Sequence, residues 1–337
     1  MAPFVPMKAR LPRRSFIRKS LVATAAVPAA LSLEERALIL ARASVGDATA
    51  PATAVASGDA MPAGKIGKVR ISRLICGGNL IGGYAHSRDL IYVSTLLKHY
   101  FTDEKIMETW LRCEREGINT MVAYPGDPHS IDVYRKYRER GGRIQYLAQL
   151  NPSKEDLRSS VKEAVGVGAV GAFLLGNLGD LWTREGDVRH IGELIKIIKD
   201  HGLIAGVAGH ENRTIKAIED AGLNPDFYVK TLHSTNYWST RQPGQNKEVI
   251  DNYAIDNYWC RDPQETINLM SEIGRPWIAY KVLAAGAIHP RAGFRYAFEN
   301  GADFVLVGMF DFQIAEDAAL AREILNGKLD RPREWMA

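Results

Sequence analysis

Short apolar runs, rich in β-branched residues, recur along most of the chain and alternate with longer segments in which apolar residues have helical spacing. The runs are Ile71–Cys76, Ile118–Tyr124, Ile144–Leu150, Gly171–Asn177, Leu203–Ala208, Asp226–His233, Trp277–Leu283 and Asp303–Val307. Continuous apolar runs of this length are typical of strands that are buried on both faces of a parallel sheet. The pattern therefore predicts eight buried strands separated by helices.

Two of the intervening segments begin with helix start signals. Asp103 precedes the predicted helix Glu104–Glu116, and Asp262 with Pro263 supplies an N-cap and a proline at the first helical position. Eight strands, each followed by a helix, predict the α/β class and a (β/α)8 TIM barrel. The alternative is an open doubly wound sheet, but the stretch Cys76–Gly83 lacks the G-x-G-x-x-G spacing of a dinucleotide loop.

Residues 1–30 differ in composition from the rest of the chain. They contain no acidic residue and six basic ones, which are Lys8, Arg10, Arg13, Arg14, Arg18 and Lys19. The short apolar run Leu21–Ala30 completes the pattern of a signal peptide. Since Arg13 and Arg14 precede Ser-Phe-Ile-Arg-Lys, we expect recognition by the twin-arginine export machinery and a periplasmic or other extracytoplasmic location. The alternative is a basic amphipathic helix on a membrane surface.

The charge of the remaining chain is nearly balanced. The whole sequence has 43 Lys and Arg against 39 Asp and Glu, so that without the six cations of segment 1–30 it carries a small negative charge. This removes the main reason to expect a nucleic-acid partner. No apolar run reaches the roughly 20 residues of a membrane-spanning helix, so we expect no stable transmembrane segment. We divide the chain into a signal peptide (1–30), a flexible linker (31–64) and the barrel domain (65–330), with buried free thiols at Cys76, Cys113 and Cys260.

Several stretches, from about Met61 to the last helix, resemble the aldo/keto reductases in order and spacing. They are Met61–Asn79, Glu116–Thr120, Ile204–Val207 with Asn224–Asp226, and Val305–Met309 with Gln313. The resemblance implies a (β/α)8 barrel with an N-terminal β-hairpin. It also implies carbonyl reduction with NADH or NADPH, which we retain as an alternative function.

The residues that carry this reductase chemistry in the family are not matched here. The Asp, Tyr, Lys and His of the family fall on Val122, Asp127, Gln149 or Leu150, and Gly176 or Asn177. The ligands of the nicotinamide amide fall on Ala208, Gly209 and Val229. Only Tyr280 matches a cofactor-contacting position, that of the tyrosine that stacks on nicotinamide. We therefore expect the barrel of the family without its hydride transfer and without NAD(P).

Other polar side chains occupy the carboxyl ends of the predicted strands, where barrels carry their sites. His210 and His233 share the inward parity of the strands that they follow, and imidazole titrates near neutral pH. We predict that both act as acid, base or metal ligand, and that Lys281 stabilises an enolate or oxyanion. Tyr124 and His129 are auxiliary candidate catalytic groups.

A divalent metal ion, Zn or Mn, is a second possibility for this end of the barrel. Its candidate ligands are His210, His233, Glu211 and Asp311, since imidazole and carboxylate suit such ions. The alternative is that the two histidines form hydrogen bonds or transfer protons without a metal.

Asn amides and aromatic rings near the same strand ends suit a sugar. The candidate substrate-binding residues are Asn177, Asn236, Tyr237, Trp238 and Tyr280. We predict an exported enzyme that uses acid–base chemistry, as a lyase, isomerase or hydrolase, on a small carbohydrate or carbonyl compound. The alternative outside enzymology is a sugar-binding or assembly protein on a disabled barrel.

Overall fold

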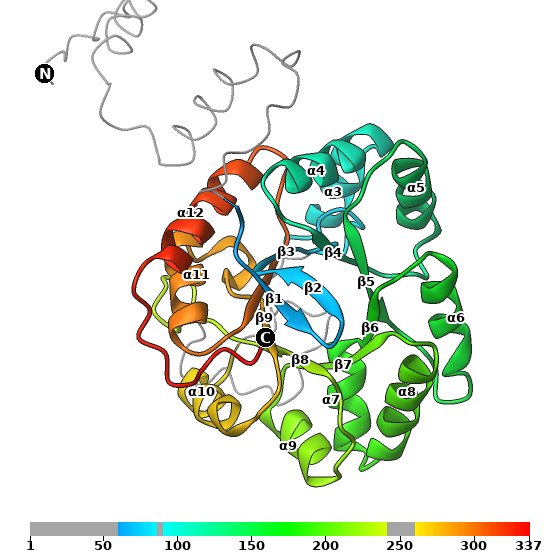
Figure 1. The fold of residues 1–337 in the computed structure, drawn as a ribbon, viewed down its shortest axis with the longest axis vertical. Helices are drawn as coiled ribbons and strands as arrows, with labels where there is room; N and C mark the ends of the chain where they lie inside the picture. Colours follow the sequence, from blue (N-terminus) through cyan, green and yellow to red (C-terminus); the bar gives the residue numbers. More distant parts are fainter. Residues whose placement is uncertain (1–59, 86–89, 241–259) are drawn as a thin grey trace, which may run out of the picture. The chain divides into compact units, whose positions relative to one another are not determined.

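The computed structural model describes residues 60–85, 90–240 and 260–337, and in them eight parallel strands close into a barrel. The strands follow one another in chain order, and the last pairs with the first (Figure 1). Their bounds are β3 (Leu74–Cys76), β4 (Thr120–Ala123), β5 (Gln145–Leu150), β6 (Gly171–Leu174), β7 (Ile204–Gly209), β8 (Phe227–Thr231), β9 (Trp277–Tyr280) and β10 (Phe304–Val307). The predicted (β/α)8 TIM barrel is confirmed.

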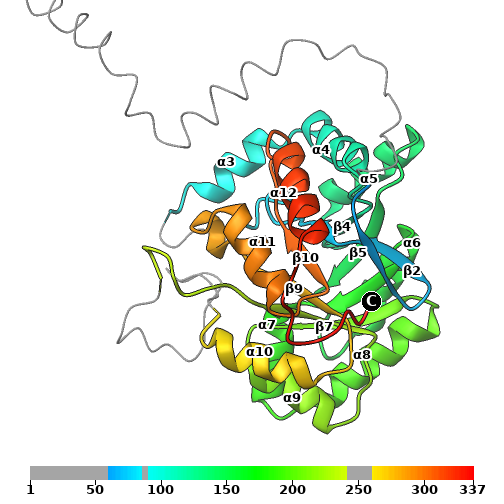
Figure 2. The same ribbon diagram turned by 60° about the vertical axis from the view of Figure 1, so that its left-hand side comes forward.

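Helices surround the barrel and fill the connections between its strands. Their bounds are α3 (Val93–Tyr100), α4 (Asp103–Arg115), α5 (Pro128–Glu139), α6 (Arg158–Gly166), α7 (Gly176–Arg184), α8 (Val188–Asp200), α9 (Asn212–Asp220), α10 (Pro263–Glu272), the 3-10 turn η1 (Ala284–Gly286), α11 (Pro290–Glu299) and α12 (Ile314–Asn326). Figure 2 shows α11 and α12 side by side over the last strands.

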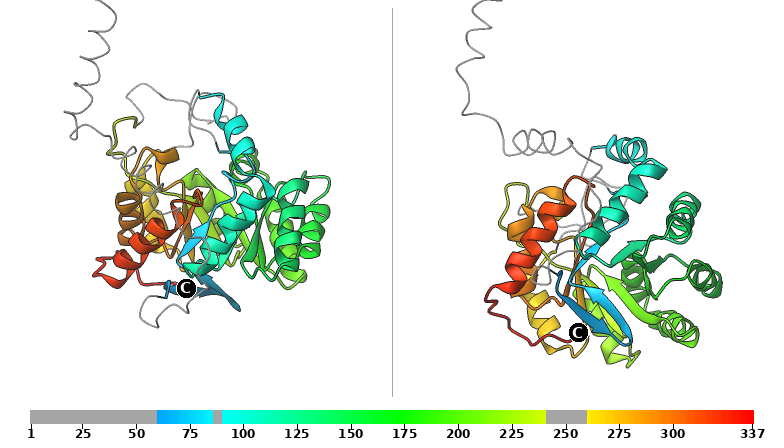
Figure 3. Two further views of the ribbon diagram at one scale, coloured as in Figure 1. Left: turned by 90° about the horizontal axis from the view of Figure 1, so that it is seen from above. Right: turned by 45° about the horizontal axis from the view of Figure 1, so that its top comes forward.

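The N-terminal hairpin predicted from the family resemblance is also confirmed. It consists of β1 (Ala63–Ile66) and β2 (Val69–Ser72), which pair antiparallel across a turn with Gly67 at φ 56°. The hairpin lies at one end of the barrel (Figure 3), and its side chains Ile66 and Val69 pack with the apolar interior of the barrel. The hairpin therefore closes the end opposite the carboxyl ends of the strands.

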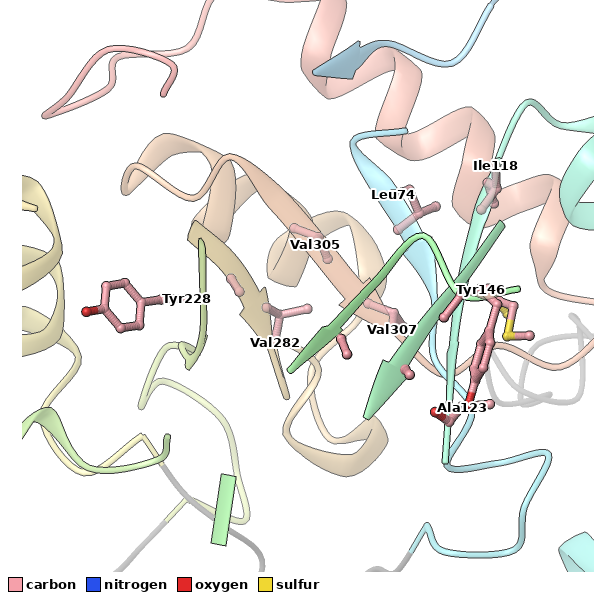
Figure 4. Packing of buried hydrophobic residues seen from close by; sticks show 14 of the residues in the cluster. Leu74, Ile118, Ala123, Tyr146, Tyr228, Val282, Val305 and Val307 are labelled. Carbon is pink, nitrogen blue, oxygen red and sulfur yellow. Dashed lines mark hydrogen bonds between the residues drawn. The ribbon is translucent and has the colours of Figure 1, made fainter. Parts of the chain in front are cut away.

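Successive strand residues alternate between two apolar layers. Ile75 and Val122 belong to the inner layer within the barrel, whereas Leu74, Tyr146 and Val305 belong to the layer between strands and helices (Figure 4). Each fully buried large side chain contributes about 1.5–3 kcal/mol relative to exposure. The alternation confirms the inward parity predicted for residues 208 and 229, since Ala208 and Val229 lie in the inner layer.

The observed ends of several elements differ from the predicted ones. The fourth strand ends at Leu174 rather than Asn177, because α7 begins at Gly176 and so places Asn177 on a helix. The N-cap of α4 is Thr102, whose hydroxyl accepts from Lys105 N, so the prediction of Asp103 was wrong by one residue. Asp262 is confirmed as an N-cap that accepts from the amide of residue 265.

Two further predictions concern features outside the barrel itself. The three cysteines are buried and free, as expected. Within the described ranges, no helix has the length and apolar character required to cross a bilayer. The predicted signal peptide and most of the predicted linker lie outside the described residues, as do residues 241–259 of the connection after β8.

Candidate active site

A buried aspartate and a buried histidine from neighbouring barrel units form the centre of the site. Asp180 lies on α7, which follows β6, and His210 is the first residue after β7. Nδ1 of His210 donates to Oδ2 of Asp180 at 2.7 Å, and both residues are less than 8% exposed. Because Nδ1 carries the proton in this bond, Nε2 is the basic nitrogen of the neutral ring.

The Asp180 carboxylate also holds the backbone that carries the histidine. It accepts from His210 N at 3.0 Å, from Glu211 N at 3.2 Å and from the Thr214 hydroxyl at 2.7 Å. Burial opposes ionisation of Asp180, but the hydrogen bonds from His210 and Thr214 outweigh it and keep the pKa of Asp180 below its ordinary value. Asp180 is therefore a carboxylate that fixes both the position and the tautomer of the imidazole.

Close packing of α7 on β7 brings the two residues together. A β-carbon at Gly179 would overlap the carbonyl oxygen of Ala208, and one at Gly209 would meet Thr214 at 3.0 Å and Asp180 Oδ1 at 3.2 Å. Because both residues are glycines, α7 approaches β7 closely enough for Asp180 to form its hydrogen bonds with His210. Figure 1 shows α7 beside β7.

His210 is neutral near neutral pH. Burial lowers the pKa of His210 to about 4, although the Asp180 carboxylate acts in the opposite direction. The positive charges of Lys281 and Lys230 lower it further. The neutral imidazole can accept a proton and a carboxylate stands beside it to stabilise the protonated form, but the lowered pKa makes the ring a weaker base than an ordinary histidine.

Tyr280 and Lys281 at the end of β9 complete the cluster. The rings of Tyr280 and His210 lie 5.3 Å apart, and Nζ of Lys281 lies 5.8 Å from the centre of the Tyr280 ring. Gly176 lies against both rings, since a β-carbon there would be 2.5 Å from Tyr280 Oη and 2.8 Å from His210 Cε1. Burial lowers the pKa of Lys281 to about 8, and the residue as a whole is partly buried. The Tyr280 ring therefore lies near both the Lys281 amine and the His210 imidazole at the barrel mouth.

Lys230 on β8 lies beneath this cluster. Its Nζ donates to the His210 carbonyl at 2.9 Å and to the Thr231 carbonyl at 3.3 Å, and the residue is only 1% exposed. Burial lowers the pKa of Lys230. The Lys230 side chain therefore holds the backbone of His210 in place by its hydrogen bond to the carbonyl.

His233, a predicted acid, base or metal ligand, has both ring nitrogens in hydrogen bonds with the backbone. Its Nδ1 donates to the Ser234 carbonyl at 2.9 Å, and its Nε2 accepts from Cys260 N at 2.8 Å. Both ring nitrogens are therefore occupied by backbone groups, one on each side of the long connection after β8. Burial lowers the pKa of His233 to about 4, which keeps the ring neutral for this arrangement.

The four predicted metal ligands are not brought together. Glu211 pairs with Arg184 at 2.9 Å and Arg213 at 2.5 Å, and Asp311 accepts from Lys105 at 3.1 Å and from the Tyr100 hydroxyl. Across residues 60–85, 90–240 and 260–337, no group of three or more His, Cys, Asp or Glu side chains is placed to hold a metal ion. The Glu211 and Asp311 carboxylates instead form ion pairs with nearby basic side chains.

The remaining predicted site residues lie in several places. His129 is on α5 rather than in a loop, and its side chain is 57% exposed and pairs with Asp103 at 2.8 Å. Tyr124 is half-buried directly after β4, and Tyr237 packs edge-on against His233 at 5.7 Å. Asn177 is half-buried on α7, whereas Asn236 and Trp238 are exposed. Among the predicted residues, the structure thus gathers His210, Tyr280 and Lys281.

The positions that match the nicotinamide ligands of aldo/keto reductases do not fit that cofactor. Ala208 and Val229 lie in the apolar interior of the barrel, and Gly209 is packed too closely against Thr214 to carry an amide side chain. These residues offer no amide hydrogen bonds to nicotinamide.

Comparisons with known proteins agree with the fold. No protein-family model matches the chain, and no curated protein sequence matches it. Two solved structures, both described as a candidate aldo-keto reductase from Pseudomonas aeruginosa, align with TM-scores of 0.55 and 0.54 at 16% and 17% identity. Each alignment covers 80% of this chain and 98% of the other. The chain therefore has the parallel eight-stranded barrel that these proteins have.

Proposed function

We propose that the chain is an enzyme that transfers a proton at the carbon next to a carbonyl group in a small carbonyl or sugar-like substrate. The observation that carries the proposal is the buried 2.7 Å bond between Asp180 and His210, beside Tyr280 and Lys281 at the carboxyl ends of the strands. In this role His210 Nε2 takes the proton, and Asp180 stabilises the imidazolium that forms. Isomerases and lyases that act through an enolate begin with this step.

The charges of the site support a reaction that builds up negative charge on the substrate. Loss of a proton next to a carbonyl leaves an enolate, which needs positive charge or hydrogen-bond donors close to its oxygen. Lys281 supplies the positive charge and the Tyr280 hydroxyl a donor, whereas Asp180 is engaged with His210 and the backbone. A positive charge on Lys281 would favour the enolate over the neutral substrate.

The test is solvent proton exchange. Glycolaldehyde, dihydroxyacetone, pyruvate and free hexoses are incubated with the protein in deuterium oxide, and loss of the C–H signal is followed by NMR. We expect exchange of at least one compound, slowed about 100-fold or more by His210→Gln and unchanged by His201→Gln, which alters an exposed histidine before β7. No exchange of any compound, together with stabilisation by NADH or NADPH, would favour a reductase instead.

We also propose that the protein works outside the cytoplasm, because residues 1–30 combine paired arginines with a short apolar run. The test is cell fractionation of the full chain in a bacterium with a twin-arginine system. We expect Arg13→Lys with Arg14→Lys to retain the protein in the cytoplasm, whereas Lys8→Arg leaves export unchanged. Equal export of the paired variant would contradict the proposal.

A further inference from the structure

Lys281 occupies a strained turn directly after β9. Lys281, Ala284 and Ala285 have positive φ angles of 60°, 46° and 57°, a conformation that costs a non-glycine residue about 1–3 kcal/mol. The turn is closed by a bond from Ala284 N to the Lys281 carbonyl at 2.9 Å, and α11 packs on it so closely that a β-carbon at Gly293 would lie 2.8 Å from the Val282 carbonyl oxygen. The packing of α11 therefore holds Lys281 in this backbone conformation at the end of the strand.

Burial also changes the protonation of the Lys281 amine. Only a neutral amine attacks a carbonyl carbon, and burial lowers the pKa of Lys281 from 10.5 to about 8. At pH 7 such an amine is neutral on the order of a hundredfold more often than an ordinary lysine. The residue as a whole is only partly buried.

Proton-transfer groups lie next to this amine but not next to the other buried lysine. The centre of the Tyr280 ring is 5.8 Å from Lys281 Nζ and 5.3 Å from the centre of the His210 ring, so the tyrosine lies near both the amine and the imidazole. Lys230 differs in burial, because the residue is only 1% exposed, whereas Lys281 is partly exposed. Of these two lysines, Lys281 is the one placed for chemistry.

We propose that Lys281 binds a small aldehyde or ketone covalently, as an imine. Neutral Nζ attacks the carbonyl carbon, so that an N–C bond forms and the carbonyl oxygen becomes the hydroxyl of a carbinolamine. The hydroxyl then leaves as water as the C=N bond forms; no oxidant or reductant is needed. Tyr280 and His210 are the groups placed to relay the protons.

The inference rests on the proposed function for its substrate class and deepens it. A protonated imine carries a full positive charge on the atom joined to the substrate carbon. It therefore accepts the electron pair that remains when His210 removes the neighbouring proton. A nearby ammonium ion cannot accept that pair and stabilises the negative charge only electrostatically.

The test is trapping with borohydride. The full chain is incubated with glycolaldehyde or pyruvate, reduced with sodium borohydride and digested, and the modified lysines are identified by mass spectrometry. We expect one reduced adduct on Lys281, formed about tenfold or more faster than at Lys196, whose side chain is 75% exposed. Modification of exposed lysines with none at Lys281, or preferential modification of Lys230, would overturn the inference.

Variants separate this inference from the proposed function. Lys281→Arg keeps the cation but cannot form the imine, so the fast adduct should vanish, whereas Lys196→Arg should leave it intact. If exchange depends on His210 but Lys281 is never trapped, the imine is wrong and the proton-transfer proposal stands. If Lys281 is trapped and no compound exchanges a proton, the imine stands and the proton-transfer proposal is wrong. Peptide mapping of the unsubstituted protein decides the matter even if Lys281→Arg fails to fold.

Discussion

Gly176 packs against Tyr280 so closely that a β-carbon at position 176 would lie 2.5 Å from Oη of the tyrosine. The same carbon would be 2.8 Å from Cε1 of His210, so one methyl group disturbs two members of the site at once. Gly176 is the first residue of α7, the helix that also carries Asp180. The absence of a side chain at position 176 allows this helix to begin in contact with the rings of Tyr280 and His210. Glycine is needed here for space.

We therefore predict that Gly176→Ala slows proton exchange about tenfold or more, because displacements of less than 1 Å at reacting groups are costly. The check is the exchange rate together with the melting temperature. Gly166→Ala is the matched control, since a β-carbon at that position on α6 meets nothing within 4 Å. If Gly176→Ala exchanges protons at the wild-type rate, close contact of residue 176 with Tyr280 and His210 is not required for the reaction.

His233 should make the free energy of unfolding of the protein fall as the pH is lowered. Its pKa is about 4 in the folded chain and 6.5 ordinarily, so between these values the unfolded chain binds the proton and the folded chain does not. The stability contributed by the neutral ring is complete above pH 6.5 and is lost as the pH falls to 4, by at most about 3 kcal/mol.

Urea unfolding of the wild type and His233→Gln at pH 7 and pH 4 checks this prediction. Near pH 7 the variant should be the less stable protein, because the bonds to Ser234 and Cys260 are disturbed. Its disadvantage should shrink as the pH falls. A difference in the free energy of unfolding that is the same at both pH values is the result that contradicts the account.

Asp317 on α12 predicts the opposite pH dependence. Burial, and then the charge of Glu316, raise its pKa from 3.8 to about 7, so the unfolded chain loses this proton first. The stability contributed by the protonated carboxyl is complete below pH 3.8 and is lost as the pH rises to 7, by at most about 4 kcal/mol.

Asp317→Asn removes this titration. Relative to the wild type, the variant should therefore gain stability between pH 4 and pH 8, as measured by chemical unfolding at both values. Glu316→Gln, at the exposed neighbouring position, should change stability by less than about 0.5 kcal/mol. If Asp317→Asn shows no gain between the two pH values, the buried carboxyl is not the group that titrates.

The barrel was predictable because the signals that specify it are local. Each strand appeared as a short apolar run, and strand parity placed His210 at the mouth. Lys281 was identified for the same reason, as a cation at a strand end. Strand ends were less accurate where a helix followed at once, as at Gly176.

Asp180 was not identified as a site residue, because its partner lies 30 residues away and the two meet only through the packing of α7 on β7. The usable signal was the pair of glycines 179 and 209, which mark a close approach of helix and strand. His233 looked equivalent to His210 from its position after a strand. Its backbone partners depend on the path of a long loop, which no spacing in the sequence reveals.

The account as a whole depends on Asp180 and His210 acting as one unit in proton transfer. The most direct measurement is the solvent exchange rate of the most responsive carbonyl compound with Asp180→Asn, His210→Gln and the double variant. We predict that each single change slows exchange about 100-fold or more and that the double change costs little beyond the larger of the two, since neither group acts without the other. Exchange that survives His210→Gln at the wild-type rate, or losses that simply multiply, would contradict it.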